Sequence, residues 1–303
     1  MKADELRPRL EGVHAYPVTP FSADLSVDVP GLRANIQFLL EAGHTVFTPL
    51  GSSGEFPNLS ANEQRLVIEV FLEELQGKES LLIPGCGSNN TAQAVEQARW
   101  SADAGVDGLL VPPPTYYPLS AQAAKVHLMA VNDATDLGLL LYYLPDWHHF
   151  DLTIPQLVDL LGSVPNIVGL KDAALDIIRI ERYLRVLGEK VVCVDGGGEF
   201  SFAFTYVAGA RAMVSTISNF WPELPLRLHA AVTEGGRGAA LEVMRGAADF
   251  LDFWYDNQST LLHKKAMEMR GLAAGPVRPP LVDPVTPEQE RRLKALLDEQ
   301  GLT

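Results

Sequence analysis

Cysteine is scarce in this sequence, as are other features that would indicate particular classes of protein. The 303 residues include only Cys86 and Cys193, each within an apolar segment and neither with a C-x-x-C neighbour. Neither a zinc site nor a redox motif is therefore indicated, and we expect two buried free thiols. The longest uninterrupted apolar run, residues 137–145, is far too short to span a bilayer.

Positively charged residues are also few relative to negatively charged ones. The chain has 24 Lys and Arg against 38 Asp and Glu, which gives a formal net charge of -14. Binding to nucleic acid requires clustered Lys and Arg to displace counterions, so neither nucleic acid nor an acidic membrane surface is an expected partner. The first ten residues carry both signs of charge and lack an apolar stretch, unlike a secretory signal. We therefore expect a cytoplasmic protein.

Apolar residues are plentiful and recur in a regular order. The sequence is 47% hydrophobic and 20% charged, which is enough to fill a large core. Short apolar runs alternate with stretches of helical period, a pattern typical of βα units and a parallel sheet. Eight runs predict strands, at residues 12–18, 44–50, 80–86, 107–113, 137–143, 166–172, 191–197 and 212–218. The stretches between them predict helices, among them 60–76, 91–104 and 175–187.

An Ala-Gly pair recurs before several of these strands, at residues 42–43, 104–105 and 208–209. Each glycine stands where a helix is expected to end before the next strand begins. Eight such units most naturally close into an α/β fold of the (β/α)8 TIM-barrel type. A doubly wound open sheet has the same pattern, but no glycine fingerprint favours it.

The pattern changes after residue 235, where the strand signal stops. Helical periods follow over residues 237–255, 259–271 and 286–300. The proline-rich connector at 274–284 cannot be helical. We therefore predict a barrel over residues 1–235 and a C-terminal helical extension over 236–303.

Lys171 is the main candidate for catalysis, because it ends an apolar strand and barrels of this kind place their active sites at strand ends. Desolvation on one side lowers the pKa of an ammonium group and makes the neutral amine available. A neutral amine attacks the ketone of a 2-oxo acid to form a Schiff base. For a lone lysine, structural pairing with Asp172 or another carboxylate is the alternative.

Other strand ends supply candidates for the same site. Tyr142 ends the fifth strand, where a phenol can shuttle protons, although a core tyrosine has the same signature. The turn that begins with Gly51, Ser52 and Ser53 offers hydroxyl and backbone N–H groups for a carboxylate.

That turn also has a purely structural interpretation, as plain turn chemistry with Ser60 capping the next helix. The seventh and eighth strands end in the stretches 195–199 and 216–219, where Gly197 and Ser218 are candidate substrate contacts.

Taken together, these residues resemble the dihydrodipicolinate synthase / N-acetylneuraminate lyase family of class I aldolases and dehydratases. The resemblance covers nearly the whole chain. It is carried by the motifs PVTPF (17–21), GSSGE (51–55), YYLP (142–145), GLKDA (169–173) and GPVRPPL (275–281).

The resemblance implies a role for each matching residue. Lys171 is then the Schiff-base lysine, Tyr142 the proton-transfer residue, and Ser52 and Ser53 the groups that hold the substrate carboxylate. Tyr117 resembles a tyrosine that crosses a subunit interface, which implies a homo-oligomer, either a dimer or a tetramer. No cofactor is implied beyond the covalent imine on Lys171, and the partner is a small-molecule 2-oxo acid.

The residues after Tyr142 depart from the synthase pattern. Trp147 stands at about the position of an arginine that binds the aldehyde substrate's carboxylate in true synthases, and an indole cannot replace a guanidinium. We expect Trp147 to line the variable half of the site. The adjacent His148 and His149, with a lone His14, do not provide the ligand count of a metal site.

The stretches 219–223 and 274–283 resemble the 5-dehydro-4-deoxyglucarate dehydratase branch most. The leading prediction is therefore a Schiff-base lyase, an aldolase or dehydratase, acting on pyruvate or a sugar-derived 2-oxo acid. The alternatives are 4-hydroxy-tetrahydrodipicolinate synthase and a non-catalytic paralogue that binds a 2-oxo acid.

Overall fold

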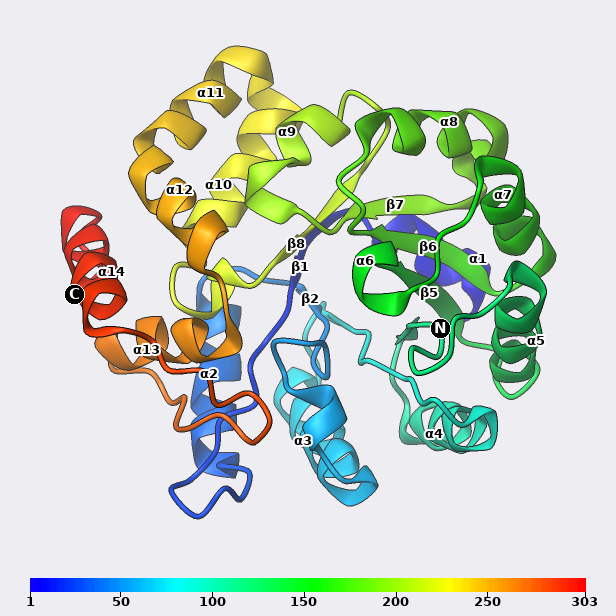
Figure 1. Ribbon diagram of the computed structural model, residues 1–303, viewed down its shortest axis with the longest axis horizontal. Helices are drawn as coiled ribbons and strands as arrows, with labels where there is room; N and C mark the ends of the chain where they lie inside the picture. Colours follow the sequence, from blue (N-terminus) through cyan, green and yellow to red (C-terminus); the bar gives the residue numbers. More distant parts are fainter. The chain divides into compact units, whose positions relative to one another are not determined.

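The computed structural model describes all 303 residues, and the chain forms a (β/α)8 TIM barrel of eight parallel strands with surrounding helices (Figure 1). The strand order is β3-β2-β1-β8-β7-β6-β5-β4. The fold class predicted from the sequence is therefore confirmed. The strands are β1 (Gly12–Ala15), β2 (Val46–Phe47), β3 (Leu81–Leu82), β4 (Gly108–Val111), β5 (Gly138–Tyr143), β6 (Ile167–Asp172), β7 (Val192–Asp195) and β8 (Ala212–Ser215).

All eight strands lie within the predicted apolar runs, and each is shorter than its run, because the runs also include turn residues. The predicted helices at 60–76, 91–104 and 175–187 correspond to α3, α4 and α8. The helices are α1 (Ala3–Leu6), α2 (Val29–Glu41), α3 (Ala61–Leu75), α4 (Thr91–Ala104), α5 (Ala121–Asn132), α6 (Pro145–His148), α7 (Ile154–Ser163), α8 (Ile177–Leu187), α9 (Phe202–Thr205), α10 (Glu223–Ala230), α11 (Gly236–Gly246), α12 (Ala248–Asn257), α13 (Thr260–Met269) and α14 (Pro287–Glu299).

The predicted helix ends are confirmed at Ser60, Gly43 and Gly105, whereas the helix before Gly209 already ends at Thr205. Ser60 caps α3 through a capping box, in which its hydroxyl accepts the N–H of Glu63 and the Glu63 carboxylate accepts the N–H of Ser60. Gly43, Gly105 and Gly209 all have positive φ angles, of 100°, 96° and 113°. Glycine adopts this conformation without steric cost, which is why the repeated Ala-Gly pair marks the turn before a strand.

Two compact units make up the chain. Unit 1 comprises Met1–Gly12 and Leu81–Val214, and unit 2 comprises Val13–Ser80 and Ser215–Thr303. The predicted boundary at residue 235 falls inside unit 2, and the division into barrel and extension stays a prediction.

Unit 1 holds the strands β3 to β7 and most of β8, and α4, α5, α7 and α8 are among its helices (Figure 1). The strands β5 and β6 pair in a register that sets Tyr142 beside Lys171 and Tyr143 beside Asp172. Side chains alternate between the two faces of a strand, so each pair lies on its own face of the sheet.

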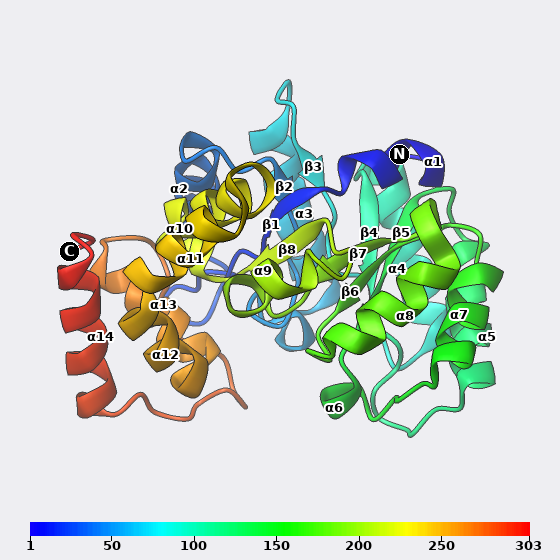
Figure 2. The same cartoon turned by 90° about the horizontal axis from the view of Figure 1, so that it is seen from above.

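The amino ends of these strands are covered by α1. A side-chain Cβ on Gly108 would lie 2.5 Å from Leu6 Cδ2, so Leu6 packs directly against the backbone where β4 begins. Gly138, the first residue of β5, is covered by Leu6 in the same way. Figure 2 shows α1 at one end of β5 and β6 and α6 at the other. The carboxyl ends, where Lys171 and Tyr142 lie, are the ends that α1 leaves open.

Unit 2 holds β1 and β2 together with α2, α3 and the helices from α10 onward. Its aromatic core includes Phe250 stacked on Trp254, with ring centroids 5.4 Å apart. The sequence predicted one helix over residues 237–255, but the structure has two, α11 and α12, which break at Ala247. That prediction was wrong because Ala247 leaves the helical conformation, with φ -114° and ψ 10°, without a Pro or Gly signal at its own position.

Cys86 and Cys193 are buried free thiols, as predicted. Among the helices there is none with both the length and the apolar character needed to cross a membrane.

Candidate active site

Lys171 lies near the end of β6 and is 4% exposed. Burial lowers the pKa of its ammonium from 10.5 to about 7, because desolvation penalises the charged form. The neutral amine is therefore far more accessible near pH 7 than in an ordinary lysine. The strand thus places a buried amine with a lowered pKa at Lys171, and its role as a nucleophile stays a prediction.

Tyr142 is the immediate neighbour of this lysine. The Lys171 Nζ atom lies 3.8 Å from the centroid of the Tyr142 ring, on the face that the strand register gives them. The ring of His148 packs edge-on against the Tyr142 ring, with centroids 4.9 Å apart and an interplanar angle of 83°. The structure therefore brings together an amine, a phenol and an imidazole.

The helix α6 that carries His148 turns its residues in different directions. His148 is 6% exposed, whereas Trp147 is 65% exposed and His149 is exposed as well. His149 ends the helix in a left-handed conformation, with φ 47°. Within unit 1, the residue that lies against Tyr142 is thus His148, and Trp147 faces outward.

The opposite face of the two strands is held by Arg179 of α8, which sequence reasoning missed. Its guanidinium lies 4.1 Å from the ring centroid of Tyr143, and its Nε lies 3.8 Å from Asp172 Oδ2. Asp172 follows Lys171 and Tyr143 follows Tyr142, so one arginine contacts the residue after each of the two candidates. The sequence offers one signal for Arg179. It precedes Ile180, which the helical period places on the buried side of α8.

Asp172 is itself buried, with 1% exposure. Desolvation raises the pKa of its carboxyl to about 6, a shift opposed by a hydrogen bond from the N–H of Ala174 and by the charge of Arg179. The alternative for Lys171 was an ion pair with this carboxylate. The strand instead directs Asp172 towards Arg179, on the face away from Tyr142.

Gly197 lies in the turn after β7, where Asp195 organises the backbone. The carboxylate of Asp195 accepts hydrogen bonds from the N–H of Gly197 at 2.9 Å and from the hydroxyls of Ser201 and Thr205. A Cβ on Gly197 would lie 2.2 Å from Ser201 Oγ. The N–H of Gly197 is thus already engaged within the turn.

Tyr117 lies on the loop after β4 and is 64% exposed. It packs edge-on against Tyr116, with ring centroids 4.9 Å apart. The side chain of Asn89 fixes the loop by accepting the N–H groups of Thr115 and Tyr116 at 2.7 and 3.0 Å. The structure therefore presents Tyr117 at the surface of the chain.

The candidates Gly51, Ser52 and Ser53 belong to unit 2. Ser53 is buried and Ser52 is exposed. Gly51 packs so closely on Tyr16 that a Cβ would lie 2.9 Å from the ring. The hydroxyl of Thr19 donates to the carbonyl of Gly54 at 2.7 Å, which ties the turn to the residues after β1.

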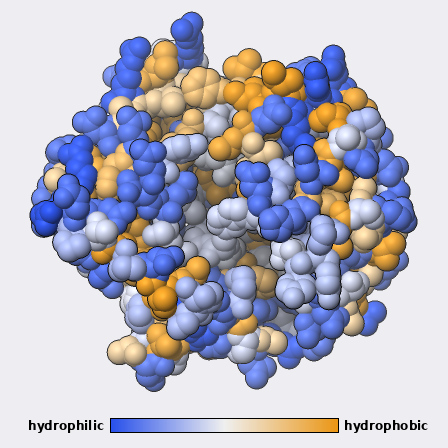
Figure 3. Space-filling view, viewed as in Figure 1, coloured by the Kyte–Doolittle hydropathy of each residue, from blue (hydrophilic) through white to orange (hydrophobic).

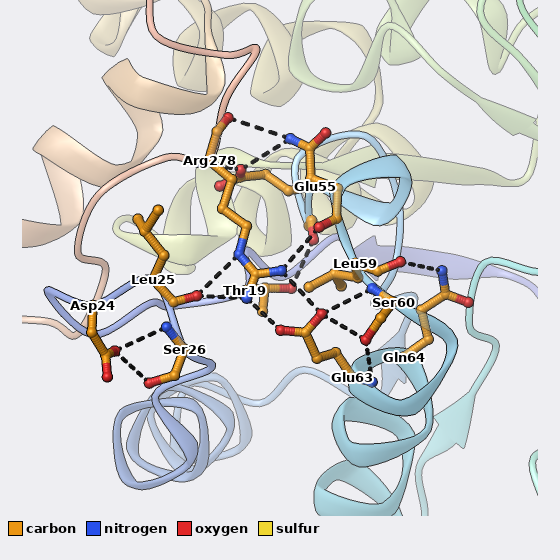
Figure 4. A network of polar contacts seen from close by, with 12 residues as sticks. Thr19, Asp24, Leu25, Ser26, Glu55, Leu59, Ser60, Glu63, Gln64 and Arg278 are labelled. Carbon is orange, nitrogen blue, oxygen red and sulfur yellow. Dashed lines mark hydrogen bonds and ion pairs between the residues drawn. The ribbon is translucent and has the colours of Figure 1, made fainter.

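A polar network fixes the same turn from its other side (Figure 4). Glu55 accepts the N–H of Arg278 at 2.9 Å and forms an ion pair with Lys264 at 2.7 Å, in which both side chains are fully buried. Arg278 also bonds Glu63, and its guanidinium lies 4.2 Å from the ring centroid of Phe21. Three sequence motifs, 17–21, 51–55 and 275–281, thus meet around one buried ion pair.

Ser218 also belongs to unit 2 and is completely buried. Its N–H donates to Ser215 Oγ at 3.0 Å, and its own hydroxyl has no hydrogen-bond partner in the structure.

The chain matches known proteins along almost its whole length. Residues 9–300 match the model of the dihydrodipicolinate synthetase family. The 4-hydroxy-tetrahydrodipicolinate synthase of Methanosphaerula palustris is 33% identical over 273 residues, which cover 89% of this chain and 93% of that protein.

Solved structures agree with this match. The dihydrodipicolinate synthase of Oceanobacillus iheyensis has a TM-score of 0.90 at 26% identity, over 99% of this chain and 100% of that one. The enzyme of Cyanidioschyzon merolae, solved with lysine bound, has a TM-score of 0.91 at 26% identity, over 97% of this chain and 99% of that one. This chain therefore belongs to the dihydrodipicolinate synthetase family and is, like its members, a lyase of the class I aldolase type.

Proposed function

We propose that this chain forms an imine between Lys171 and pyruvate and condenses it with aspartate semialdehyde, the reaction of a 4-hydroxy-tetrahydrodipicolinate synthase. The observation that carries the proposal is the buried Lys171, with its pKa lowered to about 7 and its Nζ 3.8 Å from the Tyr142 ring centroid. The relatives named as synthases match nearly the full chain, which supports this reaction over the dehydratase-like one predicted from the sequence.

The remaining predicted residues have roles within this proposal. Tyr142 transfers protons during imine formation, and the turn with Ser52 and Ser53 holds the carboxylate of pyruvate. No separate cofactor takes part, because the protonated imine on Lys171 is itself the electron sink.

A dehydratase or aldolase acting on a sugar-derived 2-oxo acid is the second candidate. It is favoured by Trp147 at the position where true synthases have an arginine, and by the lack of any Lys or Arg in residues 142–149. An aldehyde substrate with a distal carboxylate finds no cation in this segment. Substrate profiling with both classes of acceptor separates the two candidates.

The proposal predicts that borohydride traps pyruvate on Lys171. The protein is incubated with pyruvate and reduced, and the added mass is located by peptide mass spectrometry. The initial rate of trapping is expected to rise with pH through about 7 and to level off above it, because only the neutral amine attacks the ketone. A lysine with an ordinary pKa would still gain rate above pH 9.

The outcomes of this experiment are distinct. An adduct on Lys171 together with a cyclising product from added aspartate semialdehyde supports the synthase. An adduct without that product, but with turnover of a sugar-derived 2-oxo acid, favours the second candidate. A folded protein that forms no adduct contradicts the imine and leaves a binding protein.

We also propose that the chain works as a homo-oligomer. Tyr116 and Tyr117 form an exposed aromatic pair, and hydrophobic side chains gather over α8 and α9, as Figure 3 shows along the upper edge. Ile178, Phe204 and Val207 are exposed in that region. Exposed apolar patches of this kind are typical of protein interfaces. Sedimentation velocity is expected to give the mass of two or four chains, and a single monomeric species would contradict the proposal.

A further inference from the structure

His148 is a buried imidazole that the imine mechanism described above does not use. It is the last residue of α6, and with 6% exposure it is the most deeply buried residue of that short helix. Its neighbours Trp147 and His149 are exposed. The helix thus selects one of two adjacent histidines and turns it towards Tyr142.

The contacts of His148 place it within the same cluster as the catalytic amine. Its ring packs edge-on against Tyr142 at 4.9 Å, and the Lys171 Nζ lies 3.8 Å from the centroid of that same ring. Burial, and then the charge of Lys171, lower the pKa of His148 to about 4. The imidazole is therefore neutral at pH 7 and carries one nitrogen able to accept a proton.

The Nδ1 atom of His148 is buried and has no hydrogen-bond partner in the structure. Leaving a buried polar atom unsatisfied is costly, so such an atom in a native protein calls for an explanation. A substrate atom bound beside Tyr142 and Lys171 provides one. The arrangement is typical of a base that meets its proton only when the substrate is bound.

We propose that His148 is a catalytic base that removes a proton from C3 of the pyruvate imine on Lys171. The inference rests on the proposed function, because it requires that imine. It divides the proton transfers between two side chains, with Tyr142 serving the steps at nitrogen and oxygen of the forming imine and His148 serving the carbon acid.

The step balances without any further reactant. The C3–H bond breaks, its electron pair forms the C2=C3 double bond, and the iminium nitrogen regains its lone pair, while Nδ1 of His148 takes the proton. When the enamine carbon then attacks an aldehyde, the carbonyl pair moves to oxygen, and the imidazolium returns the proton to that oxygen. His148 ends the cycle neutral, as it began.

Exchange of the methyl protons of pyruvate in D₂O tests this step apart from imine formation. NMR follows the exchange with pyruvate alone, and borohydride trapping reports the imine on Lys171. His148→Asn is the informative variant, because its amide oxygen accepts a hydrogen bond near the place of Nδ1 but cannot take up a proton. We expect about 10²- to 10⁴-fold slower exchange, with trapping retained.

His149→Asn is the matched control, because His149 is the exposed neighbour and its φ of 47° suits asparagine. We expect it to leave both exchange and trapping unchanged. If His148→Asn does not give a folded protein by circular dichroism, His148→Gln is measured in its place.

Three results would overturn the inference. The first is that the folded His148 variant exchanges protons at the wild-type rate. The second is that this variant loses trapping as well as exchange. The third is that the wild-type protein traps pyruvate but shows no exchange. Failure of the wild-type protein to form the imine at all is a different outcome, since it contradicts the proposed function itself.

Discussion

Replacement of Lys171 with methionine is expected to eliminate the pyruvate adduct and to lower kcat by about 10⁴- to 10⁶-fold, the scale of loss when a covalent nucleophile is removed. Methionine fills a similar volume and suits a buried site, so the fold is retained. Trapping by mass spectrometry and turnover of pyruvate with aspartate semialdehyde measure the two effects. The effect is large because the protonated imine is the electron sink of the reaction, and without Lys171 no imine forms.

Lys190 supplies the matched control for this variant. It is an exposed lysine of unit 1, at the end of the short helical turn before β7. Lys190→Met removes the same charge without touching Tyr142 or β6, and wild-type turnover is expected. Normal activity in a folded Lys171→Met protein would show that the amine is not the catalytic group.

The second large effect concerns stability and the ion pair between Glu55 and Lys264. Both side chains are fully buried, with 2.7 Å between Lys264 Nζ and Glu55 Oε1. Lys264→Met leaves the carboxylate without its cation, so the free energy of unfolding is expected to fall by about 3–5 kcal/mol. Chemical denaturation followed by circular dichroism measures this loss.

A double variant distinguishes the ion pair from a simple packing defect. Glu55→Gln with Lys264→Met removes both charges, and we expect it to be more stable than Lys264→Met alone, because no unpaired charge stays buried. The exposed pair of Lys294 and Asp298 provides the control, since Lys294→Met is expected to change the stability little. A double variant as unstable as the single one would assign the loss to packing.

The fold was predictable from the sequence because its signals are local and repeated. Each strand run is bounded by turn residues, and the glycines at 43, 105 and 209 each supply a positive φ in the turn before a strand. The break at Ala247 was not predictable in the same way. Alanine is a strong helix former, so its own propensity gives no sign of the break.

The residues of the candidate site also differ in whether a local sequence signal marks them. Lys171 and Tyr142 were accessible to sequence reasoning, because both lie near the ends of apolar strands that pair in register. The sequence could not show whether Trp147 or His148 is the buried residue, since a four-residue helix has too few residues to show a period. Arg179 was missed because its partners, Asp172 and Tyr143, come from two different strands.

Lys171 and Tyr142 lie on strands, whereas Trp147 lies on the short helix α6. This difference bears on how the substrate of such an enzyme changes during evolution. Lys171 and Tyr142 are held by the pairing of β5 with β6, and Arg179 contacts the residue that follows each of them, so mutations there disturb the scaffold as well as the chemistry. The residues of α6 belong to no strand, and its Trp147 is largely exposed to solvent. New substrate preferences can therefore accumulate at Trp147, while His148 and the two strands retain the imine chemistry.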